Sequence, residues 1–411
     1  MTGNILSKDK GKNSTRDTVI FLAIIFLFFG YLGYEMGIGN MFSTIMETAY
    51  DLLIGTVFKI MAITVLAGAF GKLAMEFGLV SLLNKVFAPL MRPLFNMPGV
   101  ASLGIVTTYL SDNPAIISLA KDEGYIKFFK KHEIPCLCNL GTAFGMGLVV
   151  TTWMIQYGFM KEALIGNLGA FIGCIVSVRL MARSVKKELG SEKIDEPEKI
   201  RESIESHNEE LAASHLVERR EEITSHMIEQ SEGTFFERFL GAFLEGGKLG
   251  VDIGLSIVPG VLVICTVIML LTFGEVGPID QASGYEGAAY EGVGLLPAIG
   301  DKLSFILKPL LGFESPEAIA FPITALGAVG AALGLVPRFL EGGLIGGNDI
   351  AVFTAMGMCW SGFLSTHVAM LDSLGHRKLI SKGIRSHLIG GLVAGISAHY
   401  ILMFVNYIFS L

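Results

Sequence analysis

The chain has 411 residues, of which 52% are hydrophobic, and its mean hydropathy is +0.59. Apolar runs long enough to span a bilayer recur along it, so the composition excludes a soluble globular protein and indicates an all-α polytopic membrane protein. Most of the formal net charge of −7 comes from one hydrophilic segment. It therefore gives no indication of a nucleic-acid partner, and none is expected.

The first 17 residues are basic and lead into an apolar run from Thr18 to about Tyr34. This run is long and no A-x-A-like cleavage site follows it, so we expect a retained helix rather than a signal peptide. We assign residues 1–50 to this basic tail and first helix. Apolar spans are predicted at about 18–36, 52–75, 98–119, 134–158, 161–183, 251–273, 316–337, 347–371 and 386–409. Two amphipathic segments, 78–95 and 294–311, each carry charges and a proline, which suits re-entrant or tilted helices.

The segment 184–233 is rich in charge and poor in apolar residues, so it predicts a helical linker in the cytoplasm. It divides two membrane units, 51–183 and 234–411, that resemble each other. A shift of 216 residues lays Gly78-Leu79 on Gly294-Leu295 and Arg92-Pro93-Leu94 on Lys308-Pro309-Leu310. The shared order of such matches indicates an internal repeat.

Basic residues accumulate on the cytoplasmic side of membrane proteins. They place the N-terminus, the loop from Lys121 to Lys131, the exit from Arg179 to Lys187 and the loop from His376 to Arg385 inside. These placements hold only if segments 78–95 and 294–311 each cross the membrane. Each unit then has five crossings, and the second unit enters from the opposite face. We therefore predict two inverted-topology repeats with discontinuous helices, the usual architecture of secondary transporters.

An acid–amide pair interrupts each unit. Asp112 and Asn113 precede Pro114, which predicts a helix that breaks and restarts within the membrane. Asn348 and Asp349 lie in a loop-like stretch of the second unit, with Glu341 as a further buried-carboxylate candidate. Carboxylate and amide oxygens suit a sodium ion or a polar solute, although Asp112 and Asn113 would also serve as simple helix caps.

Further polar residues lie in two Gly-rich apolar runs. The first run carries Asn139, Thr142 and Thr151, and the second carries Ser361, Ser365, Thr366 and His367. Their spacing places Ser361 and Ser365 on one helix face. These side chains either line a site where the two units meet or serve in helix packing. His367 is the best candidate for a titratable group, and a structural hydrogen-bond donor is its alternative role.

The five cysteines lie in or beside apolar runs, so we expect reduced packing residues. Cys136-x-Cys138 is typical of soft-metal ligands, and Cys359 would face it across the repeat axis. A C-x-C pair alone does not define a ligand set, so no metal site is assigned.

The runs LSDNPAIISLAKD, NLGTAFGMGLVVTT and MGMCWSGFLSTHVAMLDSLG resemble the nucleoside-recognition (Gate) family of bacterial integral membrane proteins. The resemblance covers about Asp51 to the C-terminus, except for the linker. It implies a distant kinship with concentrative nucleoside transporters, ferrous-iron permease gates and spore maturation membrane proteins.

Motifs for zinc hydrolysis, serine hydrolysis and ATP-driven pumping are absent from the sequence, so no enzymatic activity is expected. We expect a secondary transporter of a small polar solute, such as a nucleoside or nucleobase, in the bacterial cytoplasmic membrane. The alternatives are a non-transporting scaffold of the spore-maturation type and a metal-ion permease. No cofactor is expected beyond Na⁺ or H⁺ as coupling ion, and the lipid bilayer is the predicted environment. The sequence leaves open whether the chain forms a homo-oligomer.

Overall fold

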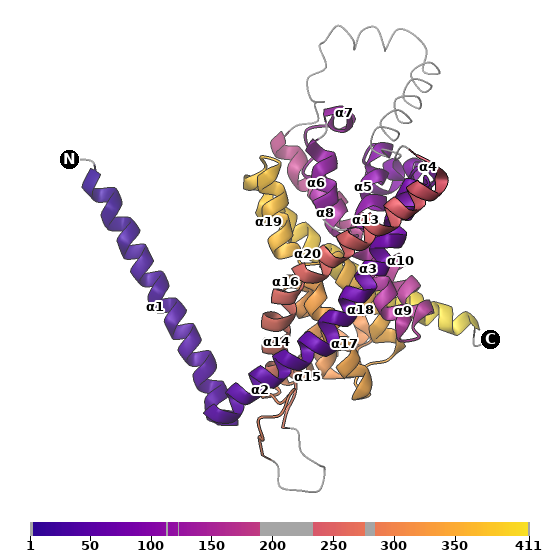
Figure 1. Cartoon of the computed structure of the whole chain (residues 1–411). Coiled ribbons are helices and arrows are strands. Elements are labelled where there is room, and N and C mark those ends of the chain that lie inside the picture. Colours follow the sequence, from indigo (N-terminus) through magenta and orange to yellow (C-terminus); the bar gives the residue numbers. More distant parts are fainter. Residues whose placement is uncertain (1–2, 112–113, 122, 190–232, 276–283, 410–411) are drawn as a thin grey trace, which may run out of the picture.

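The structure is a computed structural model that describes residues 3–111, 114–121, 123–189, 233–275 and 284–409. The described part of the protein is helical, and most of its helices pack side by side in one bundle (Figure 1). Within the described residues, six helical stretches are long and apolar enough to cross a membrane: Thr15–Met36, Ile38–Glu76, Cys136–Gln156, Met160–Lys186, Phe235–Thr272 and Arg377–Phe409. The chain is a multi-pass membrane protein.

Two series of helices repeat the same order. The first comprises α4 (Leu79–Leu90), α5 (Ser102–Leu110), α6 (Pro114–Lys121), α7 (Glu123–Ile126), α8 (Cys136–Thr142), α9 (Gly147–Gln156) and α10 (Met160–Leu189). The second comprises α15 (Leu295–Leu311), α16 (Ala320–Gly327), α17 (Val329–Glu341), α18 (Gly347–Cys359), α19 (Phe363–Ser373) and α20 (Ile380–Phe409), and it has no described counterpart of the short helix α7. In both series a short 3₁₀ turn, Gly99–Ala101 or Pro316–Ile319, follows the amphipathic helix.

Residues in the left-handed region mark equivalent positions in the two series. Gly78 (φ 80°) precedes α4 and Gly294 (φ 61°) precedes α15, while Met146 (φ 55°) precedes α9 and Gly362 (φ 63°) precedes α19. Both pairs are separated by 216 residues, which is the offset found in the sequence. The backbone therefore repeats with the same spacing as the residue matches.

Two long interrupted helices precede the series. The first consists of α2 (Ile38–Asp51), a π-helical turn (Leu52–Val57) and α3 (Phe58–Glu76); the second consists of α13 (Phe235–Ser256), a π-helical turn (Gly260–Cys265) and α14 (Thr266–Thr272). α3 and α13 pack against each other, antiparallel and side by side, in the middle of the molecule (Figure 1). Glycines permit this close approach, since a Cβ on Gly250 would lie 2.3 Å from the Thr64 carbonyl oxygen.

A second glycine-lined pair, α10 and α20, supports the interior. A Cβ on Gly173 would lie 2.4 Å from the Gly390 carbonyl oxygen, and one on Gly169 would lie 2.7 Å from the Ala394 carbonyl oxygen. These contacts bring the two backbones together along much of their length. α18 packs against both helices.

α1 (Gly3–Met36) stands apart from the bundle for most of its length (Figure 1). From Thr15 onward, where its side chains are described, most apolar side chains, including Phe26 and Leu27, are exposed, while Leu32 and Met36 near its end are buried against Met41 and Leu270. An apolar helix with such a surface suits a lipid environment.

Helices form at every predicted span, but four predicted spans are divided in two. Those at 98–119, 134–158, 316–337 and 347–371 become the pairs α5/α6, α8/α9, α16/α17 and α18/α19. The predicted break before Pro114 is present, because α5 ends at Leu110 and α6 begins at Pro114. α10 continues to Leu189, and residues 190–232 of the predicted linker lie outside the described part of the chain.

Candidate site at the interrupted helices

The half-helices α8 and α18 point toward each other along α10. At the start of α10, the Glu162 side chain contacts Gly347, and further along the Cys359 thiol donates to the Ala170 carbonyl (3.6 Å). α18 therefore runs parallel to α10. α8 runs the opposite way, because Asn139 bonds to Ser177 and Phe144, just beyond α8, packs on Phe171.

The C-terminal ends of α8 and α18 consequently meet near the middle of α10. A helix C-terminus carries partial negative charge and carbonyl oxygens without intrahelical partners. The turns that follow are short: Ala143–Met146 separates α8 from α9, and Trp360–Gly362 separates α18 from α19. α9 and α19 then leave in opposite directions.

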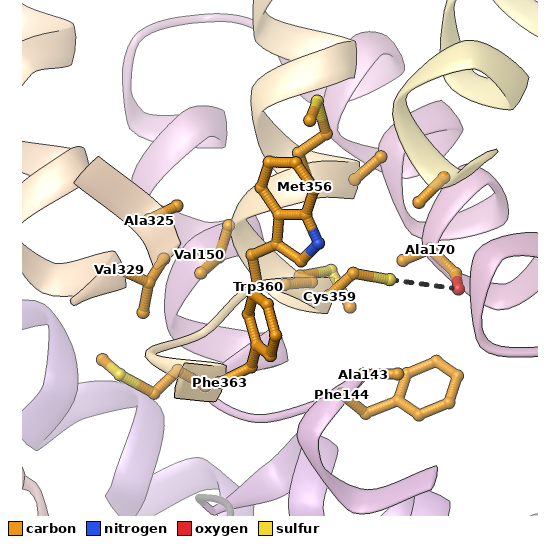
Figure 2. Packing of buried hydrophobic residues seen from close by; sticks show 14 of the residues in the cluster. Ala143, Phe144, Val150, Ala170, Ala325, Val329, Met356, Cys359, Trp360 and Phe363 are labelled. Carbon is orange, nitrogen blue, oxygen red and sulfur yellow. Dashed lines mark hydrogen bonds between the residues drawn. The ribbon is translucent and has the colours of Figure 1, made fainter. Parts of the chain in front are cut away.

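Apolar side chains fill the space around these turns (Figure 2). Trp360, Phe363 and Cys359 are drawn there beside Ala143 and Phe144 of the other turn. The Gly362 amide donates to the Ala325 carbonyl near the end of α16 (3.1 Å). This bond links the turn between α18 and α19 to the break between α16 and α17. Trp360 packs against Gly391, where a Cβ would lie 1.9 Å from the indole Nε1. Packing is therefore the role of Trp360 in this conformation.

A buried polar group, which we call the histidine cluster, lies beside this meeting point and consists of Asn139, Ser177, His367, Ser386 and His387. All five side chains are buried. The Asn139 amide donates to the hydroxyls of Ser177 (2.8 Å) and Ser386 (2.9 Å), and its Oδ1 lies 3.2 Å from His367 Nε2. His387 Nδ1 lies 2.8 Å from the Ser177 hydroxyl, and its Nε2 bonds to the Cys359 carbonyl.

The cluster brings together Asn139 and His367, two residues singled out in the sequence. Thr142 lies nearby on α8, donating to the Cys138 carbonyl (2.8 Å), and its hydroxyl is 3.8 Å from the Met370 sulfur on α19. Ser177, Ser386 and His387 were not predicted from the sequence. A histidine within the apolar helix 386–409 was a signal that could have identified His387.

A second polar group surrounds Thr151 on α9. Asn167 donates to the Thr151 hydroxyl (2.9 Å), and the Tyr109 hydroxyl lies 3.3 Å from it. Tyr109 also packs on Gly147, the first residue of α9. Tyr109 and Asn167 are only partly buried, and neither was predicted.

Asn348 and Asp349 lie far from the histidine cluster, so the expected meeting of these residues with Asn139 and His367 is wrong. Asn348 bonds to the Leu311 carbonyl (2.9 Å) and to His399 (2.7 Å). His399 follows His387 by twelve residues, which is about 18 Å along α20. Asp349 accepts the Gly346 amide (2.9 Å) and so caps α18.

Two further expectations fail for geometric reasons. Glu341 is not buried: its side chain is 67% exposed at the end of α17 and pairs with Arg338. Ser361 and Ser365 do not share a helix face, because α19 begins only at Phe363 and leaves Ser361 buried in the turn. Ser365 is exposed, and it and Thr366 bond to the Gly362 carbonyl at distances of 3.0 Å and 2.9 Å.

Asp112 and Asn113 lie outside the described residues. The described cysteines are free and buried. Cys359 does not face Cys136, because Cys359 bonds to the Ala170 carbonyl and Cys136 to the His132 carbonyl. In the described ranges, no group of three or more His, Cys, Asp or Glu side chains is placed to hold a metal ion.

Comparison with solved structures finds a distant structural similarity to concentrative nucleoside transporters. A double mutant of CNTnw in an outward-facing state aligns with 94% of this chain and 86% of its own, at 13% sequence identity and a TM-score of 0.49. CNTnw in an inward-facing substrate-bound state aligns with 95% of this chain and 87% of its own, at 13% identity and a TM-score of 0.48. A CNTnw variant in the intermediate 1 state covers the same shares at 12% identity and a TM-score of 0.49.

No family model matches the chain, and no curated protein matches it. These values assign the chain to no family, so membership of the nucleoside-recognition (Gate) family stays a prediction from the sequence.

Proposed function

We propose that this protein is a secondary transporter, which moves a small polar solute by alternating access between its two helix series. The observation that carries the proposal is the head-on meeting of α8 and α18 beside buried polar side chains. Interrupted helices expose backbone carbonyls that need a partner, and in a membrane that partner is protein, water, an ion or a solute. The opposed directions of α8 and α18 suit inverted repeats that exchange roles between two states.

The proposed solute is a nucleoside or nucleobase. The group around Thr151 offers a hydroxyl, an amide and the phenol of Tyr109, all of them uncharged at neutral pH. Such groups suit a neutral heterocycle or a sugar, and the Tyr109 ring offers a stacking surface. Asp112 and Asn113 are proposed, from the sequence alone, to bind the solute or a coupling ion.

We place the transporter in the bacterial cytoplasmic membrane with its N-terminus in the cytoplasm, on the basis of its basic residues. An ion gradient would supply the energy. A homo-oligomeric assembly is compatible with the exposed apolar surface of α1.

Ligand-dependent thermal unfolding of the purified protein tests the proposal. The panel contains nucleosides, nucleobases, amino acids and metal ions, each with and without sodium. A bound solute raises the unfolding midpoint by mass action, so we expect a rise with nucleosides or nucleobases. Thr151→Val should weaken this response, and the exposed Ser365→Ala serves as the matched control. If no compound shifts the wild-type midpoint, a non-transporting scaffold becomes the better account.

A further inference from the structure

The two imidazoles of the histidine cluster lie in an environment without charge. The centroids of the His367 and His387 rings are 4.6 Å apart, and Phe363 packs on both rings at 5.7 Å and 5.3 Å. The other facing groups are Asn139 of α8, Ser177 of α10, the Cys359 carbonyl of α18, and Ser386 of α20.

The other titratable groups nearby are engaged elsewhere. The Cys359 thiol donates to the Ala170 carbonyl, and the Lys382 ammonium pairs with Glu188. Within the described residues, neither imidazole is hydrogen-bonded to a carboxylate, lysine or arginine. Two positive charges so close together would repel each other strongly, so at most one imidazole of the pair is charged at a time.

One backbone carbonyl determines which nitrogen of each neutral imidazole carries the proton. The Cys359 carbonyl only accepts, so His387 carries its proton on Nε2. With His387 neutral, its Nδ1 must accept, and the Ser177 hydroxyl must donate to it. The Ser177 oxygen then accepts a hydrogen bond from the Asn139 NH₂ group. This bond orients the amide so that its Oδ1 faces His367 Nε2. His367 therefore also carries its proton on Nε2.

Addition of a single proton reverses the donor and acceptor roles in this series of hydrogen bonds. A proton on His387 Nδ1 makes that nitrogen a donor to Ser177, whose hydroxyl then turns to donate to Asn139. The Asn139 amide turns by half a rotation to accept it and presents its NH₂ to His367. His367 then accepts at Nε2 and carries its single proton on Nδ1. Ser386 must also turn to donate to the Asn139 oxygen, and the proton on His367 moves to Nδ1, which has no hydrogen-bond partner among the described residues. The network thus has two arrangements that differ by one proton.

We propose that the histidine cluster is a proton-binding site. Protonation of His387 changes which ring nitrogen of His367 carries its proton, and the Asn139 amide links the two changes. His367 belongs to α19 and Asn139 to α8, so the reversal acts on the contact between a half-helix of each series. This extends the proposed function by naming H⁺ as the coupling ion, and only that coupling role depends on transport. The proton-binding step is tested without any solute.

Solid-state nuclear magnetic resonance of ¹⁵N-histidine-labelled protein in lipid bilayers distinguishes the two tautomers and the doubly protonated ring. Burial without an anionic partner opposes a charge on these rings, so the titration is followed from about pH 8 down to about pH 4, and within this range we expect His387 to become doubly protonated. His367 should move its proton from Nε2 to Nδ1 over the same pH range. His367→Gln and His387→Gln assign the two signals, and His376→Gln, outside the cluster, should leave both transitions in place.

Ser177→Ala keeps both histidines and removes only the link between His387 and Asn139. We expect His387 still to titrate in this variant while the tautomer change at His367 no longer follows it. The proposal is overturned if His387 stays neutral down to about pH 4, or if His367 keeps its Nε2 proton while His387 titrates. It is also overturned if the two transitions remain linked in Ser177→Ala.

Uptake into proteoliposomes then tests the coupling role, with uridine as the probe. An inward proton gradient should accelerate uptake by the wild type, and His387→Gln should lose this acceleration while retaining exchange of uridine for uridine. Gradient-independent uptake by the wild type would contradict H⁺ coupling. Absence of any uridine movement would count against the proposed solute and leave the magnetic-resonance result standing.

Discussion

Asn139 joins three other helices through one side chain, with bonds to Ser177 on α10, His367 on α19 and Ser386 on α20. Asn139→Ala would leave these partners buried without their bonds. A buried unsatisfied polar group costs about 1–3 kcal/mol, so we expect a clearly lower thermal unfolding midpoint. Ser365→Ala, at an exposed position, should change stability by less than about 0.5 kcal/mol. Equal midpoints for the two variants would show that the cluster contributes nothing to stability.

Gly391 is the residue on which the position of Trp360 depends. A Cβ there would lie 1.9 Å from the indole Nε1, so Gly391→Ala must displace the ring. Overpacking of this kind costs about 1–3 kcal/mol, and tryptophan fluorescence should report the displacement. The control is Gly241→Ala in α13, where no atom lies within 4 Å and alanine should be neutral or stabilising. An unchanged spectrum in Gly391→Ala would contradict the packing at this turn.

At this scale the sequence identified Asn139 and His367, because amide and imidazole groups within apolar runs are costly and need partners. It did not identify Ser177 or His387 as those partners. Pairing across helices far apart in the chain depends on how α10 and α20 are rotated against each other, which no local pattern determines. Glu341 was misplaced for a similar reason, because a carboxylate at a helix end turns outward or inward according to the neighbouring helices.

The helices themselves follow the apolar runs of the sequence, but their interruptions were only partly predictable. Pro114 predicted the break between α5 and α6. The turns at Ala143–Met146 and Trp360–Gly362 gave no such signal, because Gly-rich apolar sequences also form continuous membrane helices. The left-handed residues Met146 and Gly362 mark these breaks only once the backbone is known.

The close packing of α3 against α13 depends on glycine at specific positions. At Gly250 a Cβ would lie 2.3 Å from the Thr64 carbonyl oxygen and 2.4 Å from the Val65 Cα, so Gly250→Ala must separate the two helices. We expect a loss of about 1–3 kcal/mol, measured as a lower unfolding midpoint in detergent. Gly247→Ala on the same helix meets only the Val65 Cγ1 at 3.7 Å and should be tolerated. If both variants have the same unfolding midpoint, α3 and α13 do not pack against each other through the face that carries Gly250.

For the molecule as a whole, the structure brings the start of α20 to the end of α10, where Lys382 bonds to the Ser184 carbonyl. Together with the basic residues, this predicts that the Lys121–Lys131 loop, the 184–233 linker and the His376–Arg385 loop are all cytoplasmic. Single cysteines at Lys127, Ser214 and Gly375 should resist a membrane-impermeant thiol reagent in intact cells. A cysteine at Glu341, exposed at the opposite end, should react. Labelling of any of the first three would overturn the predicted orientation.

The central claim is that the two helix series carry a solute across the membrane, and counterflow in proteoliposomes tests it most directly. Vesicles are loaded with unlabelled uridine or adenine, and entry of the labelled compound is followed without any ion gradient, so the result does not depend on the coupling ion. The account predicts transient accumulation of label by the wild type and by Ser365→Ala, and a reduction of about tenfold or more for Thr151→Val if a solute bond worth about 1.5 kcal/mol is lost. Entry no faster than into protein-free vesicles, for every nucleoside and nucleobase tested, would contradict it.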